Sequence, residues 1–154
     1  MADDQHDEPL PPPDAWNIQK SAELYQISGW GKPYFNVNEA GHVSVTPDPR
    51  KECNVDLYEL TVQLGARGLD LPLLIRFPGI LEDRIRLINE CFKKAIVEYE
   101  YDGVYRGVFP IKVNQQRHLI EEVVESGRPY RYGLEAGSKP ELLIALAAME
   151  DEDG

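Results

Sequence analysis

From residue 71 onward, the apolar residues follow two patterns, which succeed one another along the chain. Residues 71–77 form a continuous apolar run with Arg76 near its end, which is typical of a strand buried on both faces of a parallel sheet. From Leu81 to Tyr99 the apolar positions recur every three or four residues, which predicts a long amphipathic helix. Together the two patterns predict one strand–helix unit.

The same unit is predicted twice more. A strand over 107–113 precedes a helix from about 115 to 125, and a strand over 131–136 precedes a helix that begins at Ser138. Ser138 and Glu141 form a capping box, in which the hydroxyl and the carboxylate each accept a hydrogen bond from a free amide. Alternating strands and helices predict parallel pairing in a doubly wound sheet or a (β/α) barrel, and the pattern does not decide between them.

The first half of the chain is organised differently. Residues 1–15 are acidic and proline-rich, which predicts a disordered tail. A short helix is expected over 17–27, and a β-hairpin over 34–38 and 42–46, joined by a short turn that contains glycine. A further helix is expected from Val55 to Leu64.

Composition and charge restrict the function classes. With 42% hydrophobic and 28% charged residues the chain is of the globular kind, and no apolar run approaches the roughly 20 residues needed to cross a bilayer. The acidic start lacks a signal-peptide pattern, so we expect a cytoplasmic protein. A formal net charge of −11 makes nucleic acid an unfavourable partner. The cysteines and histidines lack metal-ligand spacing, so no metal site is predicted, and the cysteines are expected to be reduced thiols.

Lys112 is the residue with the clearest chemical potential. It lies near the carboxyl end of the predicted 107–113 strand, where period-two alternation places Val108, Pro110 and Lys112 on one face. A lysine that loses its charge on burial readily forms Schiff bases, and the carboxyl ends of barrel strands form the active-site face. Lysines at strand ends more often extend to solvent, however, so position alone leaves both interpretations open.

Four blocks of sequence carry a resemblance to a known family. Residues 107–115 (GVFPIKVNQ) resemble the cofactor-lysine motif of biosynthetic arginine decarboxylases, and residues 132–139 (YGLEAGSK) resemble their next block. Residues 21–31 and 34–45 resemble the amino-terminal signature of the same family. The likeness runs in the same order over about residues 16–150, which makes it highly specific.

The resemblance implies a fold similar to that of alanine racemase and ornithine decarboxylase, a barrel that binds pyridoxal phosphate joined to a β domain. Residues 16–47, with the helix and hairpin, would then form part of the β domain, and residues 48–154 the first three strand–helix units of a (β/α)8 TIM barrel. A complete barrel needs roughly 250 residues, so the chain is expected to be a truncated, amino-terminal part. The phosphate site and the partner of the pyridine nitrogen would come from later strands.

The resemblance also implies a reaction and its residues. Lys112 would hold pyridoxal phosphate as an imine, and the enzyme would convert L-arginine to agmatine and carbon dioxide for polyamine biosynthesis, with magnesium as a further cofactor and a homo-oligomeric full-length form. Glu135 corresponds to an acidic residue near the cofactor lysine of ornithine decarboxylases, so it would be a charge partner of Lys112 or the cofactor. It could equally be an acid that interacts with the amino-terminal end of the Ser138 helix.

Three alternatives stay open at this point. The chain could belong to a decarboxylase of ornithine, lysine or diaminopimelate, although these relatives lack the long 107–115 match. It could be a non-enzymatic pyridoxal phosphate carrier of the single-barrel type, which would not need the hairpin. It could also be an inactive or partner-dependent fragment, as its length alone would suggest.

Overall fold

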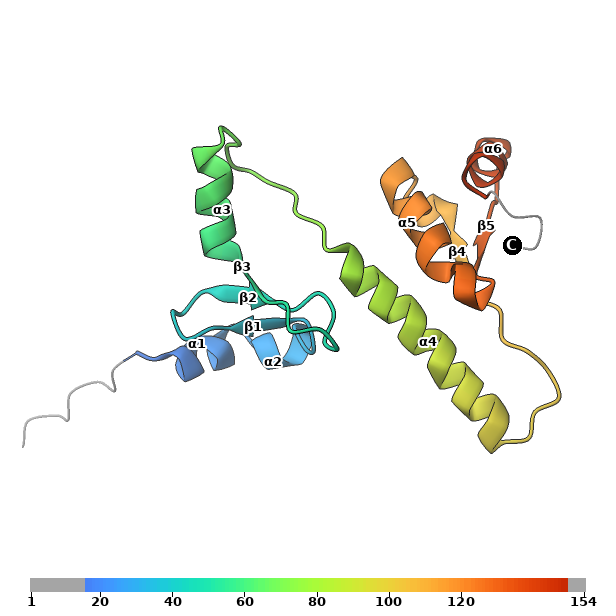
Figure 1. Cartoon of the computed structure of the whole chain (residues 1–154), viewed down its shortest axis with the longest axis horizontal. Coiled ribbons are helices and arrows are strands. Elements are labelled where there is room, and N and C mark those ends of the chain that lie inside the picture. The colour runs from blue at the N-terminus through green and yellow to red at the C-terminus, as the bar shows by residue number, and fades with distance from the viewer. Residues whose placement is uncertain (1–15, 150–154) are drawn as a thin grey trace, which may run out of the picture.

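The computed structural model describes residues 16–149, so the predicted tail at 1–15 lies outside the described residues. Figure 1 shows an amino-terminal group of elements, a long central helix and a carboxyl-terminal group. The amino-terminal elements are α1 (Ile18–Leu24), α2 (Ile27–Trp30), β1 (Phe35–Val37), β2 (Val43–Val45), β3 (Val55–Asp56) and α3 (Leu57–Ala66). The others are α4 (Pro78–Glu98), β4 (Val108–Pro110), the 3-10 helix η1 (Ile111–Val113), α5 (Arg117–Gly127), the 3-10 helix η2 (Arg128–Tyr130), β5 (Gly133–Glu135) and α6 (Lys139–Ala148).

The predicted hairpin is confirmed. Strands β1 and β2 pair antiparallel with Phe35 opposite Val45, and Gly41 closes the turn at a φ of +81°, where a side chain would be strained. A third strand, β3, was not predicted: Val55 pairs with Val45, and the following helix starts only at Leu57. The β-branched Val55 suits a strand, so it joins the sheet instead of opening the helix.

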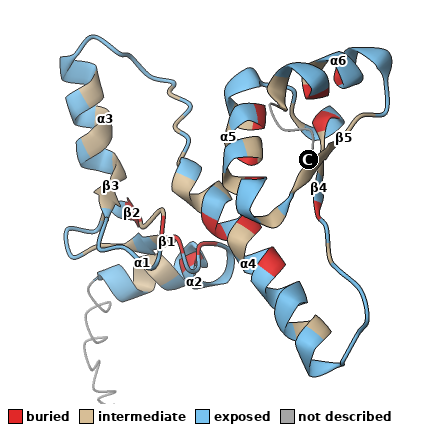
Figure 2. Cartoon of the chain, turned by 45° about the vertical axis from the view of Figure 1, so that its right-hand side comes forward, coloured by how far each residue is buried: buried red, intermediate tan, exposed pale blue. Residues whose placement is uncertain are grey.

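The carboxyl-terminal group contains the predicted parallel pairing. Strands β4 and β5 are parallel, with Val108 opposite Gly133 and Pro110 opposite Glu135. Next to these strands Ile111, Ile120 and Ala145 form a buried apolar cluster, and Figure 2 shows buried positions on α5 and α6 in red. Partly buried apolar residues pack around this cluster, namely Phe109, Leu134, Ala136, Ile144 and Ala148.

The prediction of a buried strand over 71–77 is wrong for the described structure. These residues have no regular secondary structure, with a bend at 71–72, and they pair with no strand within residues 16–149. Leu71 is 71% exposed and Leu74 is 78% exposed. Because the backbone groups of a strand need hydrogen-bonding partners, an apolar run does not become a strand where no neighbouring strand is present.

Buried charges join the hairpin to α4. The Tyr34 hydroxyl donates to Asp83 Oδ2 over 2.9 Å, and Arg86 Nη2 donates to Asp83 Oδ1 over 2.7 Å. Arg50 pairs with the buried Asp48, and its Nε lies 3.9 Å from Asp83 Oδ1. Burial alone would raise the pKa of the Asp83 carboxyl, but the hydrogen bonds from Arg86 and Tyr34 outweigh burial and lower that pKa.

We expect the substitution Asp83→Ala to lower the free energy of unfolding by about 2 kcal/mol, because it removes the acceptor of the buried Tyr34 hydroxyl and of the partly buried Arg86 guanidinium. Urea unfolding followed by circular dichroism measures this loss. The matched control is Glu82→Ala at the exposed neighbouring position of α4, with an expected change within about 0.5 kcal/mol. Equal losses in the two variants would show that the Asp83 hydrogen bonds do not stabilise the fold.

Asp56 gives the stability of the amino-terminal group a pH dependence. Its carboxylate accepts from the Glu59 amide and lies 2.9 Å from His42 Nδ1. The hydrogen bond from the Glu59 amide, helped by His42 and Asn38, lowers the pKa of Asp56 from 3.8 to about 2. Because the pKa is lower in the folded state, this contribution to stability is complete above pH 4 and is lost as the pH falls toward 2.

We therefore expect acid to destabilise the parent chain more steeply than the variant Asp56→Asn between pH 4 and pH 2. Asparagine caps a helix as well as aspartate does, but it does not titrate. Urea unfolding at several pH values measures the two slopes. Identical slopes would mean that Asp56 does not contribute to the acid sensitivity.

Candidate active site

The parallel pairing of β4 and β5 brings the two predicted site residues to the same edge of the sheet. The last paired residues are Pro110 and Glu135. Lys112 follows two residues after Pro110, so both side chains lie where the two strands end at their carboxyl termini. Within residues 16–149 no hydrogen bond or ion pair joins Lys112 to Glu135.

Lys112 lies on a turn and not within a strand, which corrects the prediction of a strand over 107–113. Strand β4 ends at Pro110, and η1 begins at Ile111, whose side chain is fully buried in the apolar cluster. The Asn114 amide closes this turn by donating to the Ile111 carbonyl over 3.1 Å. Burial of Ile111 thus turns Lys112 outward, and its side chain is exposed. A primary amine on an anchored turn is accessible to a carbonyl reagent.

The start of α6 bears on the two interpretations of Glu135. Ser138 caps α6 by accepting from the Glu141 amide, which confirms the predicted capping residues. The buried Glu141 carboxylate accepts from the Gly137 amide over 2.7 Å, one residue earlier than in the standard capping box. Glu141, and not Glu135, therefore makes the hydrogen bonds at this helix end.

Glu135 nevertheless lies close to Glu141. A Cβ atom at Gly137 would lie 3.4 Å from Glu135 Oε1 and 3.6 Å from Glu141 Oε2. The two carboxylates thus flank Gly137, and Glu135 is half-buried. Its position leaves the Glu135 carboxylate available to a positive group at the sheet edge.

Arg76 is a second cation at this side of the fold that the sequence interpretation did not assign to the site. Its guanidinium donates to Gln116 Oε1, and Gln116 directly precedes α5 and follows the turn that carries Lys112. The feature of the sequence that could have pointed to Arg76 is its charge near the end of the apolar run 71–77. Arg76 thus lies beside the segment between η1 and α5.

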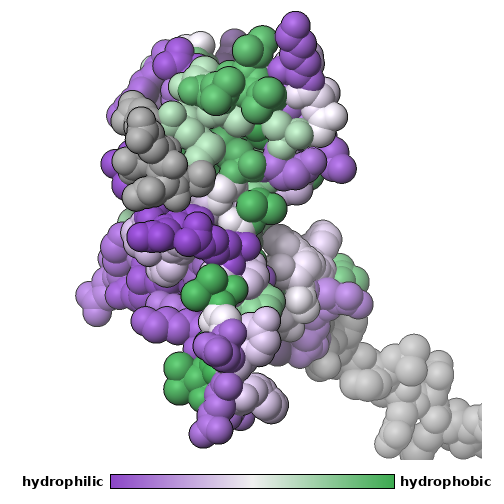
Figure 3. Space-filling view, turned by 90° about the vertical axis from the view of Figure 1, so that its right-hand side faces the viewer, coloured by the Kyte–Doolittle hydropathy of each residue, from purple (hydrophilic) through white to green (hydrophobic). Residues whose placement is uncertain are grey.

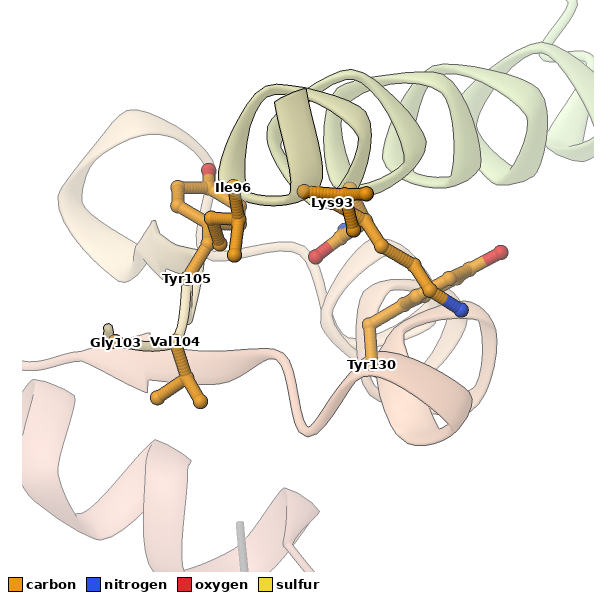
Figure 4. Close-up of a pocket in the computed structure, with 8 residues that line it drawn as sticks. Lys93, Ile96, Gly103, Val104, Tyr105 and Tyr130 are labelled. Atoms are coloured by element: carbon orange, nitrogen blue, oxygen red, sulfur yellow. The ribbon is translucent and has the colours of Figure 1, made fainter. Parts of the chain in front are cut away.

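A small cavity lies elsewhere, between α4 and the segment that leads into β4. It has a volume of about 280 Å³ and is mostly apolar, and Figure 4 shows Lys93, Ile96, Tyr105 and Tyr130 around it. Lys112 and Glu135 do not line it. This cavity is therefore separate from the candidate site.

Comparison with known proteins identifies relatives of this chain. A search of protein-family models gave no match. The biosynthetic arginine decarboxylase of Gloeobacter violaceus is 60% identical over 135 residues, which cover 88% of this chain. The chain is a homologue of biosynthetic arginine decarboxylases. The arginine decarboxylase of Nostoc sp. is 61% identical over 135 residues, and arginine decarboxylase 1 of Synechocystis sp. is 52% identical over 138.

The structural comparison agrees. The crystal structure of the biosynthetic arginine decarboxylase SpeA of Campylobacter jejuni matches 84% of this chain with a TM-score of 0.74 and 35% identity. The chain spans only about a fifth of the length of these arginine decarboxylases, 21% for Gloeobacter violaceus and 20% for Nostoc sp.. This share fits the amino-terminal part that the sequence motifs predicted. None of the helices within residues 16–149 is both long and apolar enough to cross a lipid bilayer.

Proposed function

We propose that this chain supplies the cofactor-binding lysine of an arginine decarboxylase that converts L-arginine to agmatine and carbon dioxide. The observation that carries this proposal is the placement of Lys112 at the carboxyl end of a parallel strand, in a chain 50–61% identical to arginine decarboxylases. In this reaction the bond between the α-carbon and the carboxylate breaks, carbon dioxide leaves, and a proton takes its place on the α-carbon.

The residues present fit pyridoxal phosphate as the cofactor. Lys112 offers an exposed primary amine that would hold it covalently, and the bound cofactor would supply an acceptor for the electron pair that carbon dioxide leaves behind. The anchored η1 turn fixes where the amine stands, since Ile111 is locked in the core. The phosphate site and the partner of the ring nitrogen are proposed to come from later strands of the full-length protein.

Glu135 is proposed to balance the positive charge at Lys112. Glu135 is the last residue of β5, which pairs with β4, the strand that precedes Lys112. The hydrogen bonds at the start of α6 are already made by Glu141. The half-buried carboxylate would provide a negative charge for a positive group at the sheet edge. This arrangement supports the interpretation as a charge partner over that as a helix-end acid.

The proposal includes a wider architecture. Residues 48–154 would begin a TIM barrel, and residues 16–47 would form part of a β domain, for which the confirmed hairpin is the support. We also propose magnesium as a second cofactor, a homo-oligomeric full-length enzyme and a cytoplasmic location, on the resemblance to the family. The net charge of −11 supports the absence of a nucleic acid partner.

A chimeric enzyme tests the substrate. In this chimera residues 16–149 replace the matching part of the Gloeobacter violaceus arginine decarboxylase. We expect it to release carbon dioxide from arginine and to form agmatine, as chromatography of the products would show. Faster turnover of ornithine, lysine or diaminopimelate would assign the chain to a neighbouring decarboxylase. Absence of turnover with all four amino acids, in a folded chimera with bound cofactor, would favour the non-enzymatic carrier.

A further inference from the structure

Lys112 stands on a short turn whose two ends are both fixed. At one end Ile111 is fully buried in the apolar cluster, where Ile120 also lies. At the other end the Asn114 amide donates to the Ile111 carbonyl over 3.1 Å, which closes η1. Because only Val113 separates Lys112 from Asn114 in the chain, the position of Asn114 limits where the backbone of Lys112 can lie.

The side chain of Asn114 joins this turn to the start of α5. Its Oδ1 atom accepts a hydrogen bond from the Gln116 amide over 3.0 Å, as asparagine side chains do in turns. The Gln116 carbonyl accepts in turn from the amides of Leu119 and Ile120, over 3.0 and 3.1 Å. Ile120 is buried in the same cluster as Ile111. A chain of hydrogen bonds therefore runs from η1 to the core through the carboxamide of Asn114.

The residues around Lys112 have few other contacts that could hold them. Within residues 16–149 the Asn114 carboxamide makes the one side-chain hydrogen bond that involves residues 111–115. Val113 is 68% exposed, and Lys112 and Gln115 are exposed as well. Asn114 itself is half-buried. Between the buried Ile111 and the start of α5, the side-chain restraint on the turn thus comes from Asn114.

We propose that Asn114 is a positioning residue for the covalent attachment of pyridoxal phosphate to Lys112. The inference rests on the proposed function, because it takes Lys112 as the residue that holds the cofactor. The Asn114 carboxamide holds η1 against the start of α5, and the turn then holds the amine at one place beyond the end of β4. Without this acceptor the turn has more conformations, and the amine spends less time where it can react with the cofactor carbonyl.

The rate of cofactor attachment tests the role of Asn114 without any assay of decarboxylation. Cofactor-free chimera is mixed with pyridoxal phosphate, and the link to Lys112 is trapped with borohydride at timed intervals and measured by peptide mapping. Asn114→Ala removes the acceptor and should slow attachment at least about tenfold. Asn114→Ser keeps an oxygen that can accept from the Gln116 amide, so its rate should lie within about threefold of the parent. Equal rates in the alanine and serine variants would overturn the proposal.

The matched control is His118→Ala. His118 is exposed on the first turn of α5, and within residues 16–149 its side chain makes no hydrogen bond or ion pair. Its replacement should leave the attachment rate unchanged. A rate as slow as that of Asn114→Ala would overturn the proposal, because any change near the start of α5 would then have the same effect.

A change on the donor side gives a second test if Asn114→Ala does not fold. Gln116 has a φ of −67°, which suits proline, so Gln116→Pro removes the donating amide and keeps the backbone angle. We expect it to slow attachment at least about tenfold, whereas Gln116→Ala keeps the amide and should leave the rate within about threefold of the parent. Equal rates in these two variants would overturn the proposal.

Turnover separates positioning from a loss of stability. A variant that is only less stable gives less folded protein but the same arginine turnover per bound cofactor. We expect Asn114→Ala to lower turnover per bound cofactor at least about tenfold and Asn114→Ser to restore it. Unchanged turnover per bound cofactor in Asn114→Ala would reduce Asn114 to a structural residue. A parent chimera that attaches the cofactor to Lys112 but does not decarboxylate arginine would refute the proposed function, whereas the attachment rates would still decide the role of Asn114.

Discussion

Lys112→Ala in the chimera should abolish covalent cofactor binding and reduce arginine turnover by at least about 1,000-fold, since it removes the amine proposed to hold the cofactor. Borohydride reduction followed by peptide mapping measures which lysine carries the cofactor, and we expect the label on Lys112. Urea unfolding of the variant should match the parent, because Lys112 is exposed and outside the core.

The matched control is Lys139→Ala. Lys139 is also exposed and lies on the first turn of α6, as the last residue of the second resemblance block, 132–139. Its replacement should leave labelling unchanged and turnover within about threefold of the parent. Label on Lys139 with Lys112 unmodified would move the site away from the η1 turn and refute the assignment.

Local signals were sufficient to predict the elements that depend on nearby residues. The periodic apolar positions of α4 and the turn at Gly41 determine structures within a few residues of themselves, and both were predicted correctly. The cap at Ser138 is equally local, and it was also predicted. The parallel pairing of β4 with β5 followed from the alternation of strands and helices.

Elements that depend on distant partners were predicted less well. The apolar run 71–77 has the composition of a strand, but a strand forms only where another strand pairs with it. At the candidate site, two-residue alternation predicted an extended Lys112, whereas the packing of Ile111 on Ile120 and Ala145 turned the chain into η1. Such competition between local pattern and core packing cannot be read from the sequence.

The 154-residue chain alone should not decarboxylate arginine at a measurable rate when pyridoxal phosphate is added. The described sheet with Lys112 at its end has only β4 and β5, and each has one edge that pairs with no described strand. Leu142, Leu143 and Leu146 of α6 are more than half exposed, and Figure 3 shows apolar side chains gathered on this face. Exposed apolar surface and open edges favour aggregation over a closed site.

The chemical reason for inactivity is the open surroundings of Lys112. Its amine is exposed, and water has free access to it, so any link to the cofactor would hydrolyse readily. Among the residues of this chain, Glu135 is the one proposed to balance the positive charge at Lys112. Adding the carboxyl-terminal four-fifths of the Gloeobacter violaceus enzyme in trans should restore part of the turnover, since it would supply the strands that are missing beside Lys112. Agmatine formation is measured with and without this addition. A turnover rate of the isolated chain within tenfold of that of the chimera would contradict this prediction, because the added strands would then be unnecessary for catalysis.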